Sequence, residues 1–375
     1  MIGLYVHVPY CTVRCSYCDF YLRPVGGSGF DAGGFVAALE REIAAAAASD
    51  PLARADTLHF GGGTPSRLEP GAIAAIVALA SDAFGIATGA EIGLEANPED
   101  LTPATLAGMR AAGVTRLAIG VQTFDDHLLK VLRRPHDAAR AALAVSAARR
   151  SGFQSVGVDL ILGLPGQRRA EALDGVRRAV ALGAVHLSLY LLEIHERTPL
   201  GRAVSLGRLA LPPEDETAGL YEEAADLLAL QGFEHYEISN FARPGCRSRH
   251  NVKYWTDGDY LGFGPSAHSY RGGRRFANAP DLDAWLRSPG GKGVRVEDPQ
   301  PPAVRAREAL VAGLRLLEGI DLAGLERRYA AGLPKAGDGV LEEMRRAGLV
   351  SLEGTRLSLT RRGRLVSNEV LERLV

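Results

Sequence analysis

Three cysteines near the N-terminus offer the clearest chemistry in this chain. Cys11, Cys15 and Cys18 follow a short apolar run with the spacing C-x3-C-x2-C, which places three thiolates on one loop, within reach of a single metal cluster. Cysteine thiolates hold iron–sulfur clusters, and a [4Fe–4S] cluster normally uses four of them. A cluster held by these three alone would keep one iron open to a small molecule.

Two other interpretations of the cysteines stay open at this point. A zinc ion could use the three thiolates together with His7, although structural zinc sites usually pair two separate cysteine motifs and the fourth cysteine, Cys246, is far away. The cysteines could also be buried free thiols. Disulfides are disfavoured, because the chain has four cysteines in 375 residues and shows no secretory signal. The spacing favours the iron–sulfur cluster.

A run of glycines follows the second apolar segment. Gly61, Gly62 and Gly63 come directly after Phe60 and precede Thr64. Consecutive glycines let backbone N–H groups approach a ligand with no side chain between them. The run lacks the Gly-Lys-Ser/Thr of a P-loop and the G-x-G-x-x-G spacing of a dinucleotide turn. Alone it would more often be a tight turn, but after the cysteine loop it predicts a ligand-binding turn.

Polar residues lie in or at the end of three further apolar runs. Glu95 and Gln122 end two of them, and Asp159 interrupts a third. An unpaired buried carboxylate costs several kcal/mol. Asp159 therefore needs a cation or the hydroxyl groups of a ligand as its partner, and a structural pair with an arginine is the alternative. Arg134 taken alone would be a solvated residue at a helix end.

A second group of chemically active side chains lies between residues 236 and 269. It contains His250-Asn251-x-x-Tyr254-Trp255 and a glycine-rich stretch that leads to His268. An imidazole can ligate the iron of a heme while aromatic rings pack on its plane. Taken alone, these segments are more simply explained as loops with core aromatic residues. Cys246 could contribute to a heme site or have no role in it. His268 is a weaker candidate than His250 for the ligand of the heme iron.

A regular alternation of elements must position these residues. Strands are predicted at 4–8, 57–60, 92–96, 116–121, 156–162 and 185–191, and helices at 34–48, 70–83, 103–112, 125–131, 137–151 and 169–182. Six strand–helix repeats imply a parallel sheet with right-handed crossovers, here an α/β fold with a partial (β/α)6 barrel. Such barrels carry their chemistry at the C-terminal ends of the strands, where these polar residues fall.

The pattern changes after Pro212-Pro213. A helix is predicted at 214–231 and a strand at 234–241, and a proline-rich linker at 299–302 follows. Helices are then predicted at 303–317, 322–331 and 340–347, with short strands at 350–352 and 357–359. We expect three units: a barrel at 1–212, a barrel extension at 213–300 and an α+β winged-helix-like module at 301–375.

Composition limits the classes of partner. A formal net charge of −1 gives no electrostatic reason to bind nucleic acid, so no nucleic-acid partner is expected and the C-terminal module should serve in packing. Hydrophobic residues at 46% and charged residues at 23% are typical of a globular protein. No apolar stretch approaches the length of a membrane-spanning helix. The chain begins at once with a strand, so we expect a cytoplasmic protein.

Taken together, the motifs resemble the radical S-adenosylmethionine (SAM) superfamily and, within it, the oxygen-independent coproporphyrinogen III oxidase family. The strings are YVHVPYC, CxxCDF, FGGGTPS, EANP, GVQTF and DLILGLPGQ, and with HNxxYW they cover nearly the whole chain in order. The resemblance is closest to the heme chaperone branch of that family.

The resemblance implies one [4Fe–4S] cluster on Cys11, Cys15 and Cys18, whose open iron SAM chelates. It also implies heme as bound cargo, with His250 as candidate axial ligand. The residues it implies for the SAM site are Tyr5, Gly62, Gly63, Thr64, Glu95, Gln122, Arg134 and Asp159.

Two departures separate this chain from the oxidase itself. The oxidase typically has a fourth cysteine where this chain has Phe20, and it has an extension ahead of its first strand. The expected function is therefore a heme chaperone that delivers heme to acceptor proteins, respiratory proteins among them. A homodimer and peripheral contact with membrane-bound acceptors are compatible with this role. The alternative is a radical SAM enzyme that decarboxylates coproporphyrinogen III or a related tetrapyrrole, so enzymatic activity is left open.

Overall fold

A curved parallel sheet forms the centre of the protein. The computed structural model describes residues 1–26, 29–291, 295–330, 333 and 338–374. The predicted strands are present in sequential order, as β1 (Ile2–Val8), β4 (Ala55–Gly62), β5 (Glu91–Ala96), β6 (Arg116–Gln122), β7 (Ser155–Leu162) and β8 (His186–Leu191). The predicted partial (β/α)6 barrel is therefore confirmed.

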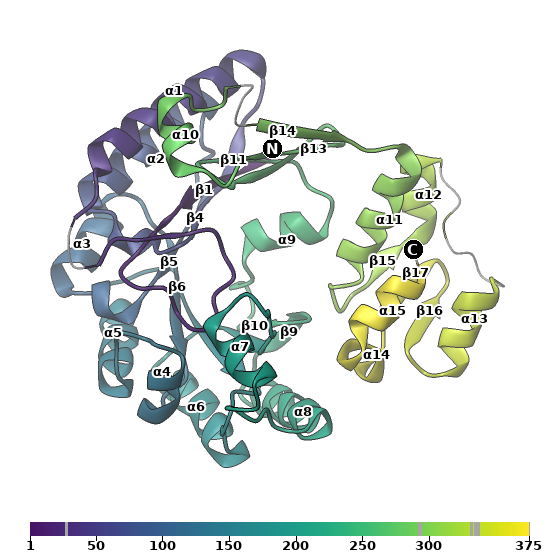
Figure 1. The fold of residues 1–375 in the computed structure, drawn as a ribbon. Helices are drawn as coiled ribbons and strands as arrows, with labels where there is room; N and C mark the ends of the chain where they lie inside the picture. The colour runs from purple at the N-terminus through teal and green to yellow at the C-terminus, as the bar shows by residue number, and fades with distance from the viewer. Residues whose placement is uncertain (27–28, 292–294, 331–332, 334–337, 375) are drawn as a thin grey trace.

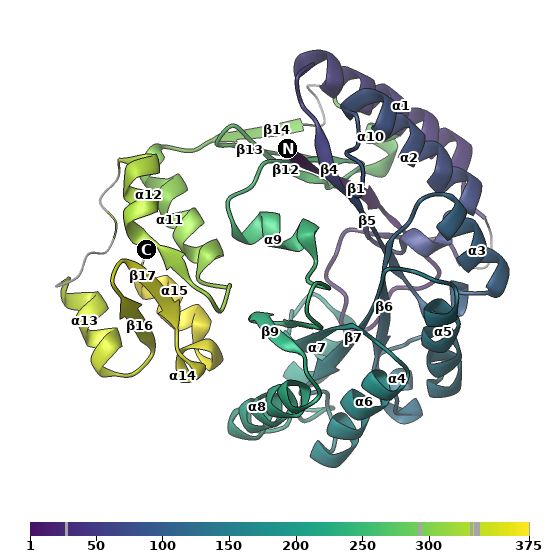
Figure 2. The same cartoon turned by 180° about the vertical axis from the view of Figure 1, so that it is seen from behind.

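Helices cover the convex side of this sheet, as Figures 1 and 2 show from opposite directions. They are α1 (Ala32–Ser49), α2 (Pro70–Phe84), α3 (Pro103–Ala111), α4 (Asp126–Val131), α5 (Ala138–Arg150) and α6 (Arg169–Ala181). Two short 3-10 helices, η1 (Pro65–Arg67) and η2 (Pro98–Asp100), lie in the loops after β4 and β5. Local sequence fixes several helix ends: the Asp31 carboxylate accepts the Gly34 N–H at the start of α1, and Gly85 ends α2 with φ +57°.

The two faces of each strand differ in chemistry. Along β1, Leu4, Val6 and Val8 are fully buried, and the alternate positions Tyr5 and His7 make polar contacts within the barrel. Successive strand residues point to opposite faces, so a strand between a helix layer and a lumen can be apolar on one face and polar on the other. The same alternation runs along β5, where Leu94 precedes Glu95. This pattern places polar side chains inside the barrel.

Further strands extend both edges of the sheet, which has the order β14-β13-β12-β11-β1-β4-β5-β6-β7-β8-β10-β9. β11 (Tyr260–Phe263) joins β1 in parallel, and β12 (His268–Arg271), β13 (Arg274–Asn278) and β14 (Arg295–Pro299) follow antiparallel. On the other edge are β9 (Glu234–Glu237) and β10 (Asn240–Ala242). The single strand predicted at 234–241 is therefore wrong, because the chain reverses there and forms two antiparallel strands.

Further short strands and helices connect these elements. β2 (Tyr10–Cys11) and β3 (Arg23–Pro24) pair across the cysteine segment. α7 (Pro199–Ser205) and α8 (Glu214–Leu230) follow β8, and α10 (Leu282–Arg287) packs beside α1. α9 (Arg249–Trp255) faces the concave side of the sheet in both views (Figures 1 and 2).

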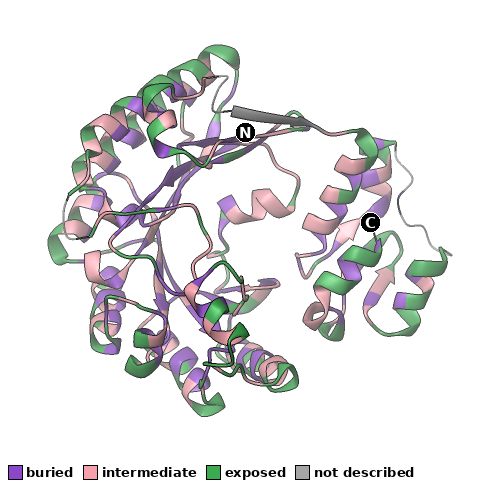
Figure 3. Ribbon diagram, in the orientation of Figure 1, coloured by how far each residue is buried: buried purple, intermediate pink, exposed green. Residues whose placement is uncertain are grey.

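The C-terminal residues form a module with its own core. It contains α11 (Pro302–Gly313), α12 (Leu322–Tyr329), α13 (Gly339–Arg346), α14 (Arg361–Leu365), α15 (Ser367–Leu374) and a three-stranded sheet of β15 (Ile320–Asp321), β17 (Arg356–Leu359) and β16 (Val350–Glu353). Leu310, Leu341 and Leu357 are fully buried within it, and Figure 3 shows the buried positions gathered inside the barrel and inside the module. The first helix ends at Gly313, four residues before the prediction, and residue 331 of the second predicted helix lies outside the described residues.

This architecture agrees with the expected winged-helix-like module, while the exact division into three units stays a prediction. Within the described residues, no helix has the length and apolarity required to cross a membrane.

Candidate functional site

The C-terminal ends of the parallel strands open into a cavity of about 440 Å³. Ligands bind at this end of parallel barrels because the strand-to-helix loops converge there. The cavity is lined by most of the residues predicted from the sequence: Cys11, Cys15, Cys18, Gly62, Gly63, Thr64, Glu95, Gln122, Arg134 and Asp159. We call it the first cavity. The structure brings the cysteines, the glycine turn and the polar strand ends into one site.

Hydrogen bonds hold the cysteine segment in a defined loop. The Arg14 guanidinium donates to the Cys18 carbonyl at 3.3 Å and to the Leu22 carbonyl at 3.2 Å. Cys11 and Cys15 are buried, and Cys18 is half-buried. Burial raises the pKa of the Cys11 thiol to about 11. Metal ligands must be deprotonated, so cluster assembly on this loop must release protons.

The glycine turn lies against the cysteine segment. Gly62 adopts φ +106°, and a Cβ atom at Gly63 would lie 2.8 Å from the Val8 carbonyl oxygen. Only glycine fits these two positions without strain or collision. The next residue, Thr64, places its hydroxyl 3.0 Å from the Cys11 Sγ. The tight turn thus brings bare backbone and one hydroxyl next to the cysteines.

Arg134 supplies positive charge to the same cavity. Its guanidinium donates to Asn97 Oδ1 at 2.6 Å and to the Gly120 carbonyl at 2.8 Å, and it lies 3.4 Å from the Cys15 Sγ. The preceding residue, Arg133, has φ +57°, a conformation that is costly for a non-glycine residue. Arg134 therefore turns toward the cavity, where a fixed cation favours a thiolate or a ligand carboxylate.

Two carboxylates reach the cavity from the barrel lumen. Asp159 on β7 receives a hydrogen bond from Ser188 on the neighbouring strand, and Glu95 Oε1 lies 3.3 Å from His59 Nε2. Burial raises the pKa of Asp159 to about 7, and the Ser188 hydrogen bond opposes this shift. Asp159 thus has a hydroxyl as its hydrogen-bond partner, and it retains capacity to accept bonds from a ligand.

Tyr5 is placed differently from the other predicted SAM residues. It lines a second cavity, of about 520 Å³, and is not among the residues that line the first. A Cβ atom at Gly61 would lie 2.9 Å from the Tyr5 ring and 3.1 Å from Glu95 Oε1. Tyr5 lines the second cavity and Glu95 the first, so the two cavities share a wall at Tyr5, Gly61 and Glu95.

His250 lies toward the N-terminal ends of the strands, away from the cysteines. Only 1% of its surface is exposed. Its Nδ1 lies 2.9 Å from the Thr57 hydroxyl and its Nε2 lies 2.7 Å from the Tyr254 hydroxyl. Burial holds the pKa of His250 well below its ordinary value. Iron coordination needs a free ring nitrogen, so heme ligation by His250 stays a prediction that requires the ring to leave one of these bonds.

A buried ion pair anchors the segment that carries His250. Arg116 Nε donates to Glu91 Oε2 at 2.9 Å, and the Arg116 guanidinium also donates to the Cys246 carbonyl at 2.6 Å. The His250 backbone N–H in turn donates to Glu91 Oε1 at 3.0 Å. Cys246 therefore contributes its backbone to this anchor, at the starts of β5 and β6.

The interpretation of the sequence missed several residues that line the first cavity. Asn97 bridges Arg134 and the Thr64 hydroxyl, to which its Nδ2 donates at 3.4 Å. Tyr17, between two of the cysteines, and Tyr190, near the end of β8, also line the cavity. Asn97 belongs to the string Glu-Ala-Asn-Pro and directly follows the end of β5. This position at a strand end, two residues after Glu95, could have predicted its place in the cavity.

Similarity to known proteins extends along the whole chain. The heme chaperone HemW of Mycobacterium tuberculosis is 37% identical over 377 aligned positions, which cover 100% of this chain and 94% of that protein. The chain belongs to the HemW family. HemW of Bacillus subtilis is 32% identical over 99% of this chain and 98% of its own length.

Domain models match two parts of the chain, and one solved structure shares its fold. The Radical SAM superfamily model matches residues 5–179, and the HemN C-terminal domain model matches residues 300–366. The coproporphyrinogen III oxidase HemN of Escherichia coli superposes with a TM-score of 0.84 at 24% identity, covering 100% of this chain and 89% of that chain. This structural likeness establishes the fold.

Radical SAM membership implies a [4Fe–4S] cluster and SAM, and the donor set of the first cavity fits both. Three thiols, a glycine turn without side chains, and the free acceptor capacity of Asp159 face one space. In the described part of the chain, no three His, Cys, Asp or Glu side chains stand close enough together to hold one metal ion. A zinc ion needs all its thiolate ligands about 2.3 Å away, whereas the cysteines of a cluster bind separate irons. The C-x3-C-x2-C spacing and the Radical SAM match favour a cluster.

Proposed function

We propose that this chain is a heme chaperone that binds a [4Fe–4S] cluster, SAM and heme, and delivers heme to acceptor proteins. The observation that carries the proposal is the 37% identity to a heme chaperone across 100% of the chain. Phe20 stands where the oxidase has its fourth cysteine, and this replacement favours the chaperone over the oxidase. Phe20 lines the first cavity, with 67% of its surface exposed.

Each residue of the first cavity has a physical role in the proposal. Cys11, Cys15 and Cys18 hold the cluster, and the fourth iron is left to SAM. The backbone at Gly62 and Gly63 leaves room for the amino and carboxylate end of SAM. Thr64 and Gln122 add polar contacts, and Arg134 supplies positive charge beside the cysteines. Glu95 and Asp159 accept hydrogen bonds from the hydroxyl groups of SAM, and Tyr5 backs this end of the cavity from the shared wall.

Delivery of heme needs partners beyond the chain itself. We propose heme proteins, including respiratory ones, as acceptors, with action in the cytoplasm, peripheral contact with membrane-bound acceptors and a homodimer as the working form. Cell fractionation, and sedimentation of the cluster-loaded protein with and without heme, test the location and the dimer directly. A chaperone that works as a monomer in another compartment would remove these parts of the proposal and leave heme binding intact.

An anaerobic reconstitution distinguishes the chaperone from the decarboxylase. The cluster-loaded protein is mixed with SAM, a reductant and coproporphyrinogen III, and protoporphyrinogen and 5′-deoxyadenosine are quantified together. In parallel, heme is added and its transfer to an apo heme protein is followed by absorbance. We expect heme binding and transfer without porphyrin product. Multiple turnovers of both products would make the protein a decarboxylase, and failure to bind heme would refute the chaperone.

A further inference from the structure

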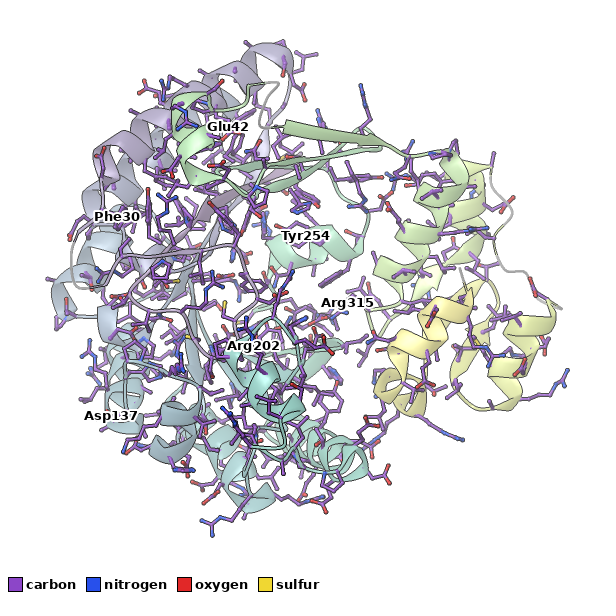
Figure 4. All side chains as sticks on the ribbon, in the orientation of Figure 1. Phe30, Glu42, Asp137, Arg202, Tyr254 and Arg315 are labelled. Carbon is purple, nitrogen blue, oxygen red and sulfur yellow. The ribbon has the colours of Figure 1, made fainter. Side chains whose placement is uncertain are left out.

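The second cavity lies on the concave side of the sheet, away from the cysteines. Its walls come from β1, α9, the strands β11 to β13 and the first helix of the C-terminal module, α11. In Figure 4 the labelled Tyr254 lies on α9 and the labelled Arg315 just after α11, where the Arg315 guanidinium lies 4.5 Å from the centre of the Trp255 ring and connects α9 to the module. Its volume of about 520 Å³ is in the range of sites for cofactor-sized ligands. We infer that this cavity is the heme site and that His268 is the ligand of the heme iron.

This inference rests on the proposed function, because it assigns a place to the heme that a chaperone carries. The aromatic lining is the first argument for it. Tyr254 and Tyr260 meet edge to face with ring centroids 4.7 Å apart, and Tyr5, Trp255 and Tyr270 complete the aromatic wall. Aromatic side chains bury large apolar areas, and Tyr and Trp keep a polar tip, which suits a flat macrocycle with an apolar body and acidic edges.

The histidines that face this cavity differ in whether their ring nitrogens already have hydrogen-bond partners. His7 and His268 both line it. Both ring nitrogens of His7 already have partners: Nδ1 lies 3.2 Å from the Tyr5 hydroxyl, and Nε2 lies 3.0 Å from the Tyr21 carbonyl oxygen. His268 is exposed, and within the described residues its ring makes no hydrogen bond or ion pair. A neutral imidazole with a free nitrogen is a common protein ligand of heme iron.

Polar groups also lie at the edge of the cavity. Trp255 lines it, and the buried Trp255 Nε1 has no hydrogen-bond acceptor among the described residues. Arg275 pairs with Glu308 at 2.6 Å and lies over the Tyr270 ring at 4.7 Å. A heme propionate can compete with Glu308 for Arg275.

Backbone strain also occurs in the lining of this cavity. Five non-glycine residues have positive φ in the described ranges, and two of them, Asp257 at +53° and Ser266 at +64°, line the second cavity. Two others, Gln122 and Arg133, lie at or next to the first cavity. Strained conformations persist where the surrounding structure holds them and are concentrated at binding sites. The strain therefore marks the second cavity in the same way as the first.

The test is a heme titration of the full-length, cluster-loaded protein, followed by the heme Soret band in difference spectra. His268→Ala is expected to weaken heme binding by at least about ten-fold, because loss of even an outer-shell partner commonly costs a metal site that much. Added imidazole should restore the Soret band of the parent in this variant, because it can replace the missing ligand of the heme iron. His127→Ala, an exposed histidine on α4 that lines neither cavity, is the matched control and should titrate like the parent.

A second variant tests the cavity independently of the ligand. Ala312→Phe fills the space from α11 and should block heme, while iron content and SAM binding stay as in the parent. Unchanged titrations in both His268→Ala and Ala312→Phe would overturn the inference, and loss of the Soret band in His250→Ala alone would move the ligand to His250. Heme binding by the parent in those cases would leave the proposed function standing. Failure of the parent to bind heme would refute the proposed function itself.

Discussion

Replacing Asp159 by asparagine should make the ligand-free protein more stable and at the same time weaken SAM binding. The carboxyl lies in the barrel lumen, where burial raises its pKa from 3.8 to about 7. The folded chain thus resists ionisation of this group. The Asp159→Asn variant removes that cost, because an amide keeps the size of the side chain and never ionises. The expected gain in stability therefore depends on pH.

The magnitude follows from the two pKa values. Below pH 3.8 the carboxyl is protonated in both the folded and the unfolded chain, so it contributes no pH dependence. Between 3.8 and about 7 the folded chain keeps a proton that the unfolded chain releases, so the free energy of unfolding falls as pH rises. At about 1.4 kcal/mol per pKa unit, the full cost above pH ~7 is about 4 kcal/mol, and roughly 2 kcal/mol of it develops between about pH 5.5 and about pH 8.5.

The assay is urea unfolding of the ligand-free protein at these two pH values, followed by circular dichroism. The stability gained by Asp159→Asn should be about 2 kcal/mol larger at the higher pH. Asp174→Asn, at an exposed position on α6, is the matched control and should show no such growth. A gain that is equal at both pH values would refute the raised pKa. A variant that gains stability and binds SAM as tightly as the parent would show that Asp159 has no role in the SAM site.

Three further predictions concern the cluster, the glycine turn and the buried ion pair. Cys18→Ser should lose most of the iron and the brown absorbance after anaerobic reconstitution, with the far-ultraviolet circular dichroism unchanged; full iron content would remove Cys18 from the cluster. Gly63→Ala places a Cβ 2.8 Å from the Val8 carbonyl oxygen, so it should cost about 1–3 kcal/mol of stability, measured by urea unfolding against Gly71→Ala, where the Cβ meets open space. Arg116→Met leaves the buried Glu91 carboxylate without its cation, and should cost about 3–5 kcal/mol in the same assay, whereas a loss within about 1 kcal/mol would mean that the neutral donors to Glu91, such as the His250 N–H, suffice to hold it.

The parallel sheet could be predicted from the sequence because each of its strands is an apolar run bounded by a helix pattern. The same runs also showed which residues stand at strand ends, since Glu95, Gln122 and Asp159 interrupt or close them. The C-terminal ends of neighbouring parallel strands meet at one edge, so these side chains had to converge. This geometric rule is why most of the first cavity was predictable.

The position of His250 was not predictable in the same way. Its neighbours in sequence, Tyr254 and Trp255, identify a group of residues that suits heme, but α9 belongs to no strand–helix repeat. Its place is set by long-range bonds to Thr57 and Glu91, which lie more than 150 residues earlier in the chain. Contacts between positions so far apart leave no periodic signal in the sequence, so the sequence indicated the residue types and not the end of the barrel to which they belong.

The two cavities give a physical reason for carrying a cofactor and a cargo on one chain. Glu95 at the first cavity contacts His59 at 3.3 Å, and the His59 ring stacks on His250 with centroids 5.1 Å apart. His250 in turn meets the Tyr254 hydroxyl, on a residue that lines the second cavity. A line of contacts thus joins the first cavity to the aromatic wall, and the wall that the two cavities share would separate SAM from heme. Because the cluster and the heme would occupy separate spaces, each can be loaded and removed without competition for the same residues.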